Sequence, residues 1–442
     1  MSESAIRNLY LSGAILLALA TALLVVTGNG ALPVVGVALF VMFYAFAYAV
    51  QHTKSLSGIS FTFQIFAFVA FTLYFPQVFT NWGFNTKILI VPSVQLIMFG
   101  MGTKLSLTDF AREFRRPVKI LLGSALGFIL MPLVGILIIN MYHFPPEVAA
   151  GVILIGTCPT GAASNVMTYL ARGNLALALS ITMLTTLAAP FTTPLLMKFF
   201  AGQLIAVNTI SMMTGILNMV VVPVAAGLIC NRILYSKDPA SWFKQAGNLL
   251  GLAAVCFALG VGLIFVPFGA SVKSLQSGLI LVLWSVSTVS VTKMLVARAQ
   301  GPEDWMEMVL PKLSLVSIML YIVIVAAHSR ATLLSIGPAL FLATVIHNLL
   351  GLALGYGCAR ALRLSDADTR TFALQVGLKN AGVGVGLAYD VLKSEPAALA
   401  SLIFGTWMNV SGSTLANYWR QRPPDEPPQT RAARTSVEPA NA

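Results

Sequence analysis

The residues Gln375-Val-Gly-Leu-Lys-Asn-Ala-Gly-Val-Gly-Val-Gly386 interrupt an apolar segment that is long enough to cross a bilayer. They include four glycines, two amides and Lys379. Each glycine weakens a helix by roughly 1 kcal/mol relative to alanine. A charge at mid-membrane costs at least a few kcal/mol and needs a polar partner or a water-filled cavity. Because Lys379 lies far from the next charges, Arg370 and Asp390, snorkelling from a helix end is the weaker explanation. The stretch therefore predicts a helix broken inside the membrane, with freed backbone groups lining a site.

The composition excludes an ordinary soluble protein. The 442 residues are 57% hydrophobic and 10% charged, with a mean hydropathy of +0.84, whereas soluble domains carry about 25% charged residues. The four cysteines lie in apolar runs without metal-like spacing, which indicates small buried side chains rather than disulfides. The sequence has no nucleotide motif and no nucleophile–base pair, so we expect neither an ATP-driven pump nor an enzyme, and no cofactor.

A spanning helix needs about 20 apolar residues. On this criterion we predict fourteen all-α membrane segments, some of them broken, and a retained first helix rather than a signal peptide. The segments are 8–27, 31–50, 61–80, 88–103, 117–141, 147–171, 174–198, 210–234, 247–268, 275–297, 312–328, 333–360, 368–391 and 396–419. The tail 421–442 is rich in proline and charge, and we expect it to be disordered.

The basic residues indicate how these segments are oriented. With the N-terminus inside, 21 lysines and arginines fall on the inner side, and five on the outer side: Lys87, Lys198, Lys273, Arg330 and Lys393. This bias predicts cytoplasmic termini, an inner (plasma) membrane location and contact with the lipid bilayer. It explains the net charge of +12 without a nucleic-acid partner.

A second break lies in the first half of the chain, in Gly156-Thr-Cys-Pro-Thr-Gly-Ala-Ala-Ser-Asn-Val-Met-Thr168. Pro159 and Gly161 interrupt the helix, and the polar residues Ser164 and Asn165 follow. An isolated proline kink would be a packing feature. Two breaks in corresponding halves instead predict an inverted-repeat transporter whose site lies where the broken helices meet.

At these residues the chain resembles the bile acid:sodium symporter family. The resemblance covers about 61–237 and 309–420. The motifs that carry it are Leu96-Ile-Met-Phe-Gly-Met-Gly102, the Cys158–Asn174 run, His347-Asn348, Val376-Gly-Leu-Lys-Asn380, Trp407-Met-Asn-Val-Ser-Gly-Ser413 and Tyr418-Trp419.

The resemblance implies a ten-helix inverted-repeat core, made of a panel domain and a core domain with two crossed broken helices. Residues 59–238 would hold the first repeat and the start of the second, with the first broken helix at 147–171. Residues 309–420 would hold the rest, with the second broken helix at 368–391. Two additions lie outside the family pattern: two helices in 1–58 and a hairpin in 239–308. They would form either a periphery or a homodimer interface.

The resemblance also implies a region for the coupling ions, and the chain departs from the pattern there. Ser164, Asn165 and Thr182 match sodium ligands, but Ala178 stands at a serine position. Gln375 stands where the family has a shared glutamate, and Lys379 and Gly127 stand at two glutamine positions. An ammonium a few ångströms from a sodium ion would repel it by several kcal/mol at an effective dielectric near 20. We therefore expect sodium coupling to be lost or altered, with Lys379 in place of a sodium ion.

The substrate side of the pattern is better preserved. Asn380 and Asn409 match amides that flank the family's substrate cavity, and Thr160 compensates in part for Ala162, which replaces a threonine. Met408 replaces a histidine. With Lys379 and helix N-termini supplying positive potential, the expected function is secondary transport of a small organic anion by alternating access. The alternatives are a conventional sodium-coupled symporter and a non-transporting sensor or scaffold on the same fold.

Overall fold

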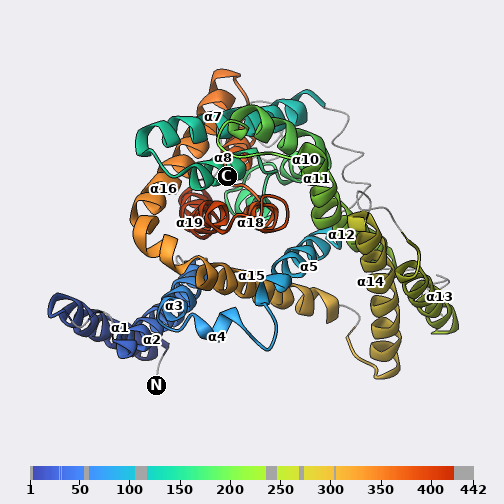
Figure 1. The fold of residues 1–442 in the computed structure, drawn as a ribbon, viewed down its shortest axis with the longest axis horizontal. Coiled ribbons are helices and arrows are strands. Elements are labelled where there is room, and N and C mark those ends of the chain that lie inside the picture. The colour runs from blue at the N-terminus through green and yellow to red at the C-terminus, as the bar shows by residue number, and fades with distance from the viewer. Residues whose placement is uncertain are drawn as a thin grey trace, which may run out of the picture.

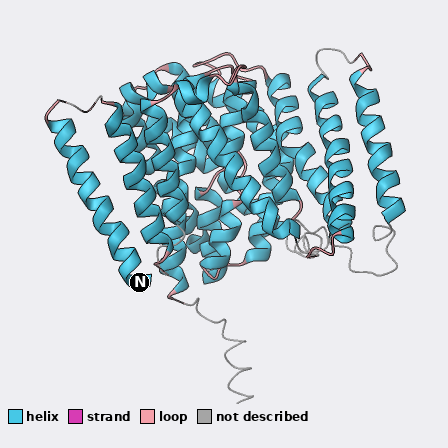
Figure 2. Cartoon of the chain, turned by 90° about the horizontal axis from the view of Figure 1, so that it is seen from below, coloured by secondary structure: helices cyan, strands magenta, loops and turns pink. Residues whose placement is uncertain are grey.

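The computed structural model describes residues 3–28, 30, 32–53, 59–104, 117–234, 246–267, 273–302 and 305–422, with the side chains of 3–6, 246 and 273–275 left out. This part of the chain is all-α, and its long helices run side by side (Figure 2). Nine of its helices are long and apolar enough to cross a membrane, and shorter apolar helices accompany them. The protein is thus a multi-pass membrane protein. The expected disordered tail falls almost wholly on 423–442, outside the described residues.

Each of the fourteen predicted segments is found as helix. Before the first broken helix come α1 (Glu3–Val26), α2 (Pro33–Gln51), α3 (Ser60–Tyr74), α4 (Gln77–Thr80), η2 (Thr86–Leu89), α5 (Ile90–Gly102) and α7 (Pro117–Tyr142). The two broken helices are α8 (Pro146–Thr157) with α9 (Ala163–Leu170), and α17 (Asp366–Gly377) with α18 (Ala381–Asp390). Between and after them come α10 (Leu175–Ala201), α11 (Thr209–Ile216), η3 (Leu217–Val221), α12 (Val222–Leu234), α13 (Ala246–Ile264), α14 (Lys273–Arg298), α15 (Trp305–His328), α16 (Arg330–Ala361) and α19 (Glu395–Arg420).

Two groups of helices make up the transporter fold. The core domain consists of α7, α8/α9, α10, α16, α17/α18 and α19, which pack around the two broken helices. The panel domain consists of α3, α5, α11/α12 and α15, with α5 between α12 and α15. The two domains meet where α18 packs against α5 and where α19 packs against α3 and α15 (Figure 1).

The two predicted additions, α1 with α2 and α13 with α14, extend the panel domain at opposite ends (Figure 1). The pair α1 and α2 packs on α3, while α14 packs on α12 and carries α13 beyond it. A separate apolar cluster that includes Cys230, Leu249 and Val289 joins the hairpin to the panel. The additions lie at the periphery of this chain, and homodimerisation through them stays a prediction.

The structure differs from the predicted segments in three places. The segment 61–80 ends its helix at Tyr74, and a separate short helix, α4, follows it. The segment 312–328 begins earlier, at Trp305, because Pro311 is accommodated inside α15. The segment 210–234 contains a π-helical turn, η3, between α11 and α12. A π-turn leaves no mark in apolar periodicity, so the sequence pattern could not reveal it.

Candidate functional site

The unwound centres of the two broken helices lie against each other. Both segments are extended there, and Thr160 and Lys379 form an antiparallel bridge. The amide of Gly161 donates to the Leu378 carbonyl at 3.1 Å, and the amide of Asn380 donates to the Pro159 carbonyl at 2.9 Å. The breaks therefore satisfy each other's backbone groups, as a membrane interior requires. The prediction that the two breaks meet is confirmed.

Glycine at position 161 is needed for this close approach. A Cβ atom there would lie 2.7 Å from the carbonyl oxygen of Lys379. That distance is too short for any side chain. Gly161 thus sets how closely the two extended segments pack.

Three polar side chains close a hydrogen-bonded triangle beside the crossing. The Gln375 amide donates to Asn165 Oδ1 at 3.2 Å, and the Thr182 hydroxyl lies 3.0 Å from Gln375 Oε1 and 2.9 Å from Asn165 Oδ1. The three residues come from α17, α9 and α10, and all are buried. Ser164, the neighbour of Asn165, donates its hydroxyl to the Gly161 carbonyl at 2.7 Å. Four of the five expected coupling residues therefore lie side by side at the crossing: Ser164, Asn165, Thr182 and Gln375.

Lys379, the fifth expected coupling residue, extends from the crossing to α7. Its side chain is 1% exposed, and its Nζ donates to the Gly127 carbonyl at 2.9 Å. The ammonium also lies 5.4 Å from the centre of the Phe128 ring, a cation–π contact. Among the described residues, no ion pair includes Lys379. The Lys379 side chain is thus held by one carbonyl and one ring, with no carboxylate partner in the described part of the chain.

The ammonium of Lys379 lies beside Gly127. An ideal Cβ built on Gly127 has only Lys379 Nζ within 4 Å, at 3.7 Å. A Cβ at 127 would therefore make an ordinary contact with the ammonium, and a longer side chain there would lie beside Lys379. Because glycine has no side chain, the Lys379 ammonium can approach the backbone of α7 at position 127.

Of the three expected substrate residues, Asn380 contacts the panel. Asn380 Oδ1 accepts from the Val383 amide and so caps α18, while its Nδ2 lies 3.5 Å from Met98 Sδ on α5. Asn409 is half-buried on α19, where its Nδ2 bonds to the Gly405 carbonyl one turn earlier. Thr160 is placed differently, because its hydroxyl donates to the Gln375 carbonyl at 3.1 Å. The Thr160 hydroxyl thus gives a backbone carbonyl of α17 its hydrogen bond and is not directed at the panel.

Sequence reasoning missed the groups that hold the break from outside. The Asn348 amide donates to the Gly377 carbonyl at 2.9 Å, and its own oxygen accepts from Ser411. His347 contacts the Met131 carbonyl at 2.9 Å through Nε2. The available signal was Pro132, which lies inside the continuous helix α7 and supplies no N–H to it. Lys379 and His347 both bond to carbonyls close to this proline.

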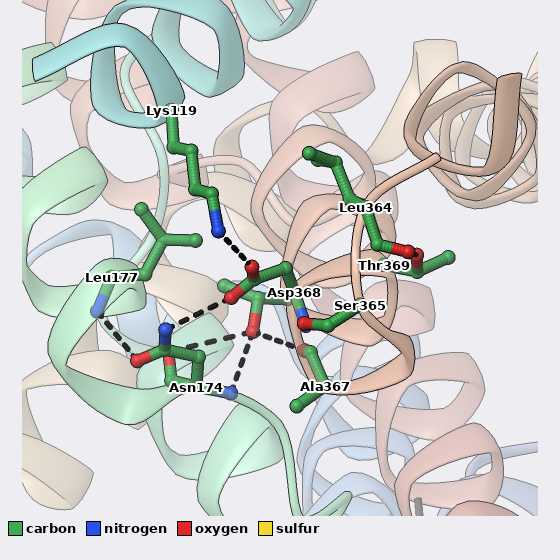
Figure 3. Close-up of polar contacts among 9 residues, drawn as sticks. Lys119, Asn174, Leu177, Leu364, Ser365, Ala367, Asp368 and Thr369 are labelled. Carbon is green, nitrogen blue, oxygen red and sulfur yellow. Dashed lines mark hydrogen bonds and ion pairs between the residues drawn. The ribbon is translucent and has the colours of Figure 1, made fainter. Parts of the chain in front are cut away.

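A second polar cluster joins the two repeats where α7, α10 and α17 begin (Figure 3). Asp368 accepts from Lys119 Nζ at 2.6 Å and from Asn174 Nδ2 at 2.9 Å. Asn174 also caps α10 by accepting from the Leu177 amide. At the opposite end the capping residue of α19, Ser394, donates to Glu147 in the first turn of α8 at 2.8 Å. Each broken helix is thus anchored at its start by a cap from the other repeat.

Comparison with known proteins agrees with this architecture. The model of the "Sodium Bile acid symporter family" matches residues 91–277. The uncharacterized sodium-dependent transporter YocS of Bacillus subtilis (strain 168) is 31% identical over 373 residues, which cover 84% of this chain and 94% of that protein. The probable chloroplastic sodium/metabolite cotransporter BASS1 of Arabidopsis thaliana is 26% identical, over 79% of this chain and 71% of that protein.

Among solved structures, the sodium proton antiporter MjNhaP1 from Methanocaldococcus jannaschii aligns over 95% of this chain and 97% of its own. Its TM-score is 0.42 and its sequence identity is 13%, and we draw nothing from a similarity at that level. The sequence relatives carry the assignment, and their names are those of transporters rather than enzymes. With 31% identity over nearly the full length of a relative, this chain belongs to the sodium bile acid symporter family.

Proposed function

We propose that this protein carries a small organic anion across the cell's inner membrane by alternating access, with Lys379 taking the place of one coupling sodium ion. One observation carries the proposal: an ammonium that is 1% exposed lies at the crossing of two broken helices, bonded to a carbonyl and without a carboxylate partner among the described residues. A buried cation of this kind is expensive. Its cost is offset where an anion binds close by.

The electrostatics of the crossing favour an anionic cargo. The helices α9 and α18 both begin there, and helix N-termini carry partial positive charge. The start of α9 has no side-chain cap, and its Ser164 and Asn165 amides bond to the Gly161 and Ala162 carbonyls. Asn380 and Asn409 are our candidates for amide donors to the substrate. Asn380 has its Nδ2 at the panel, where α18 packs against α5.

Alternating access is supported by the division into two bodies. Mutual backbone bonds and the reciprocal caps hold the core together. The core meets the panel where α18 packs on α5 and α11 and where α19 packs on α3 and α15, and Lys87 of η2, just before α5, pairs with Glu395 at the start of α19. We propose that the core moves as a unit against the panel and exposes the crossing to either side in turn.

The coupling mode separates this proposal from its rival, a conventional sodium symporter. The printed names of the relatives describe sodium-dependent transport, which favours the rival. In this chain Gln375 is neutral, and it contacts Asn165 and Thr182, with no carboxylate among the three residues. These contacts favour altered coupling. Both termini would be cytoplasmic, as the distribution of basic residues predicts.

Uptake by proteoliposomes tests the proposal. Carboxylates ranging from short monocarboxylates to amphipathic acids are offered with a sodium gradient, with a potassium gradient, and with neither. We expect saturable uptake of at least one carboxylate at a rate that is the same in sodium and potassium. A steep sodium requirement would establish the conventional symporter instead, and no uptake of any carboxylate would favour the non-transporting sensor or scaffold.

The variant Asn380→Ser sharpens this test. Serine caps a helix about as well as asparagine, so α18 keeps its cap and loses only the Nδ2 donor. A substrate hydrogen bond lost from a buried site costs roughly 1–3 kcal/mol, which predicts uptake weakened about 5- to 100-fold. Gln421→Ser, at the end of α19 and away from the crossing, is the matched control.

A further inference from the structure

A groove of about 610 Å³ lies outside the core domain, between the panel and the inserted hairpin. Its walls are α5, α14 and α15. It is largely apolar, with Leu281, Trp284 and Leu313 among its lining residues. Two walls, α5 and α15, belong to the panel and the third, α14, belongs to the hairpin, so the groove is distinct from the crossing of the broken helices.

The groove has the dimensions of a single long hydrocarbon chain. Its lining on α14 runs from Ser277 to Thr292, which corresponds to about 22 Å at 1.5 Å per residue. At roughly 30 Å³ for a water-sized group, its volume holds about twenty such groups. One extended acyl chain fits this space, and two do not.

A basic residue without an ion-pair partner lies beside the groove. Lys312 is exposed on α15, between the lining residues Val309 and Leu313. Its exposed neighbours on the helix are apolar: Leu313 is 41% exposed and Val316 is 64% exposed. None of the ion pairs formed by the described residues includes Lys312. An ammonium on a lipid-facing helix surface favours an anion next to it.

The end of the groove where α14 ends and α15 begins has residues that are typical of a membrane interface. Trp305, the first residue of α15, lines the groove, and Arg298 ends α14 as an exposed residue. Tryptophan is enriched at the level of lipid headgroups, and a lysine two turns inside a helix reaches back to that level. An amphiphile with its chain in the groove would place its headgroup between Arg298 and Lys312.

From this combination we propose that the groove binds one acyl chain of an anionic membrane phospholipid, with the headgroup held by Lys312 and Arg298. A zwitterionic phospholipid would bring a quaternary ammonium together with its phosphate, and that cation would be repelled by Lys312 and Arg298. A second copy of this chain would have to fill a narrow groove with a helix, which is wider than a single hydrocarbon chain. The bound lipid would join the inserted hairpin to the panel.

Native mass spectrometry of the full-length protein tests this proposal. The protein is delipidated in mild detergent and titrated with phosphatidylglycerol and with phosphatidylcholine. Three variants are compared: Lys312→Gln together with Arg298→Gln, which removes the anion contacts; Thr288→Phe, which fills the groove at an exposed lining residue; and the control Lys198→Gln, an exposed lysine in the last turn of α10.

We expect one tightly bound phosphatidylglycerol per chain and at least tenfold weaker phosphatidylcholine binding. The double charge variant should weaken phosphatidylglycerol binding about tenfold or more, since bonds to charged groups are worth roughly 1.5–3 kcal/mol, and it should leave phosphatidylcholine unchanged. Thr288→Phe should abolish tight binding of either lipid. The control should match the unmodified protein.

Equal binding of both lipids, or phosphatidylglycerol binding unchanged in the charge variant, would overturn the proposal. A dimer that Thr288→Phe converts to monomer would also overturn it, because the groove would then bind a second copy. Both charge substitutions are at exposed residues, so these variants remain informative even if Thr288→Phe misfolds.

Discussion

Gly127 and Lys379 should behave as one coupled unit in a double-mutant cycle. In Gly127→Gln the Cβ would lie 3.7 Å from Lys379 Nζ, an ordinary contact, and the rest of the new side chain would have to fit beside the ammonium. Overpacking of this kind costs about 1–3 kcal/mol. In Lys379→Gln the Gly127 carbonyl loses its charged donor at 2.9 Å. In the double variant the glutamine at 127 fills the vacated space, so the loss of stability should be smaller than the sum of the single losses.

The measurement is thermal unfolding of the four proteins in one detergent. Contacting residues show interaction energies of about 0.5–3 kcal/mol, while independent sites add within about 0.5 kcal/mol. We expect a coupling of at least about 1 kcal/mol in the compensating direction. Additivity within error would refute the idea that the two positions share one volume.

The same variants test the coupling ion. An ammonium and a sodium ion about 4 Å apart repel by about 4 kcal/mol at an effective dielectric near 20, which is roughly a thousandfold in affinity. We expect uptake by the unmodified protein to be indifferent to exchange of sodium for potassium. Adding Gln375→Glu to the double variant supplies the missing negative charge and should introduce sodium dependence. A steep sodium requirement in the unmodified protein, with normal transport by Lys379→Ala, would contradict this reasoning.

Three further results are expected. Gly161→Ala should destabilise the protein by about 3 kcal/mol or more, since its Cβ would lie 2.7 Å from a carbonyl oxygen, whereas Gly382→Ala meets nothing closer than 3.6 Å and should melt within a few degrees of the unmodified protein. Asn348→Ala leaves the carbonyl at the end of α17 without its donor and should cost about 1–3 kcal/mol in unfolding; an unchanged melting temperature would mean that this carbonyl has another partner. Asn409→Ala should lower uptake about 5- to 100-fold at equal expression, and unchanged uptake there and in Asn380→Ser would place the cavity elsewhere.

The fold was predictable because membrane-spanning helices leave a strong signal. Apolar runs located all fourteen segments, and glycine and proline located both breaks. Lys379 was recognised as buried because no charge stands near it in the sequence. These inferences depend on local composition, which the bilayer constrains directly.

The partners of these residues were not predictable in the same way. Lys379 bonds to a carbonyl 252 positions away, and Asn348 bonds to a carbonyl 29 positions away. Every residue has a carbonyl, so the sequence does not indicate which one is free. Thr160 shows the same limit, because its hydroxyl bonds to the backbone of α17 and not toward the panel. The type of side chain predicts that it makes a hydrogen bond, but only the fold shows which group is its partner.

The reciprocal backbone bonds at the crossing have a consequence for biogenesis. Gly161 donates to Leu378, and Asn380 donates to Pro159, so neither break can complete its bonds until both have been synthesised. About 220 residues separate them, which at roughly 5–20 residues per second means some ten to forty seconds of translation. During that interval the first half of the transporter holds an open helix end inside the membrane. It must wait beside the insertion machinery or in water until its counterpart leaves the ribosome, and truncated chains that end before residue 378 should be targets for membrane proteolysis.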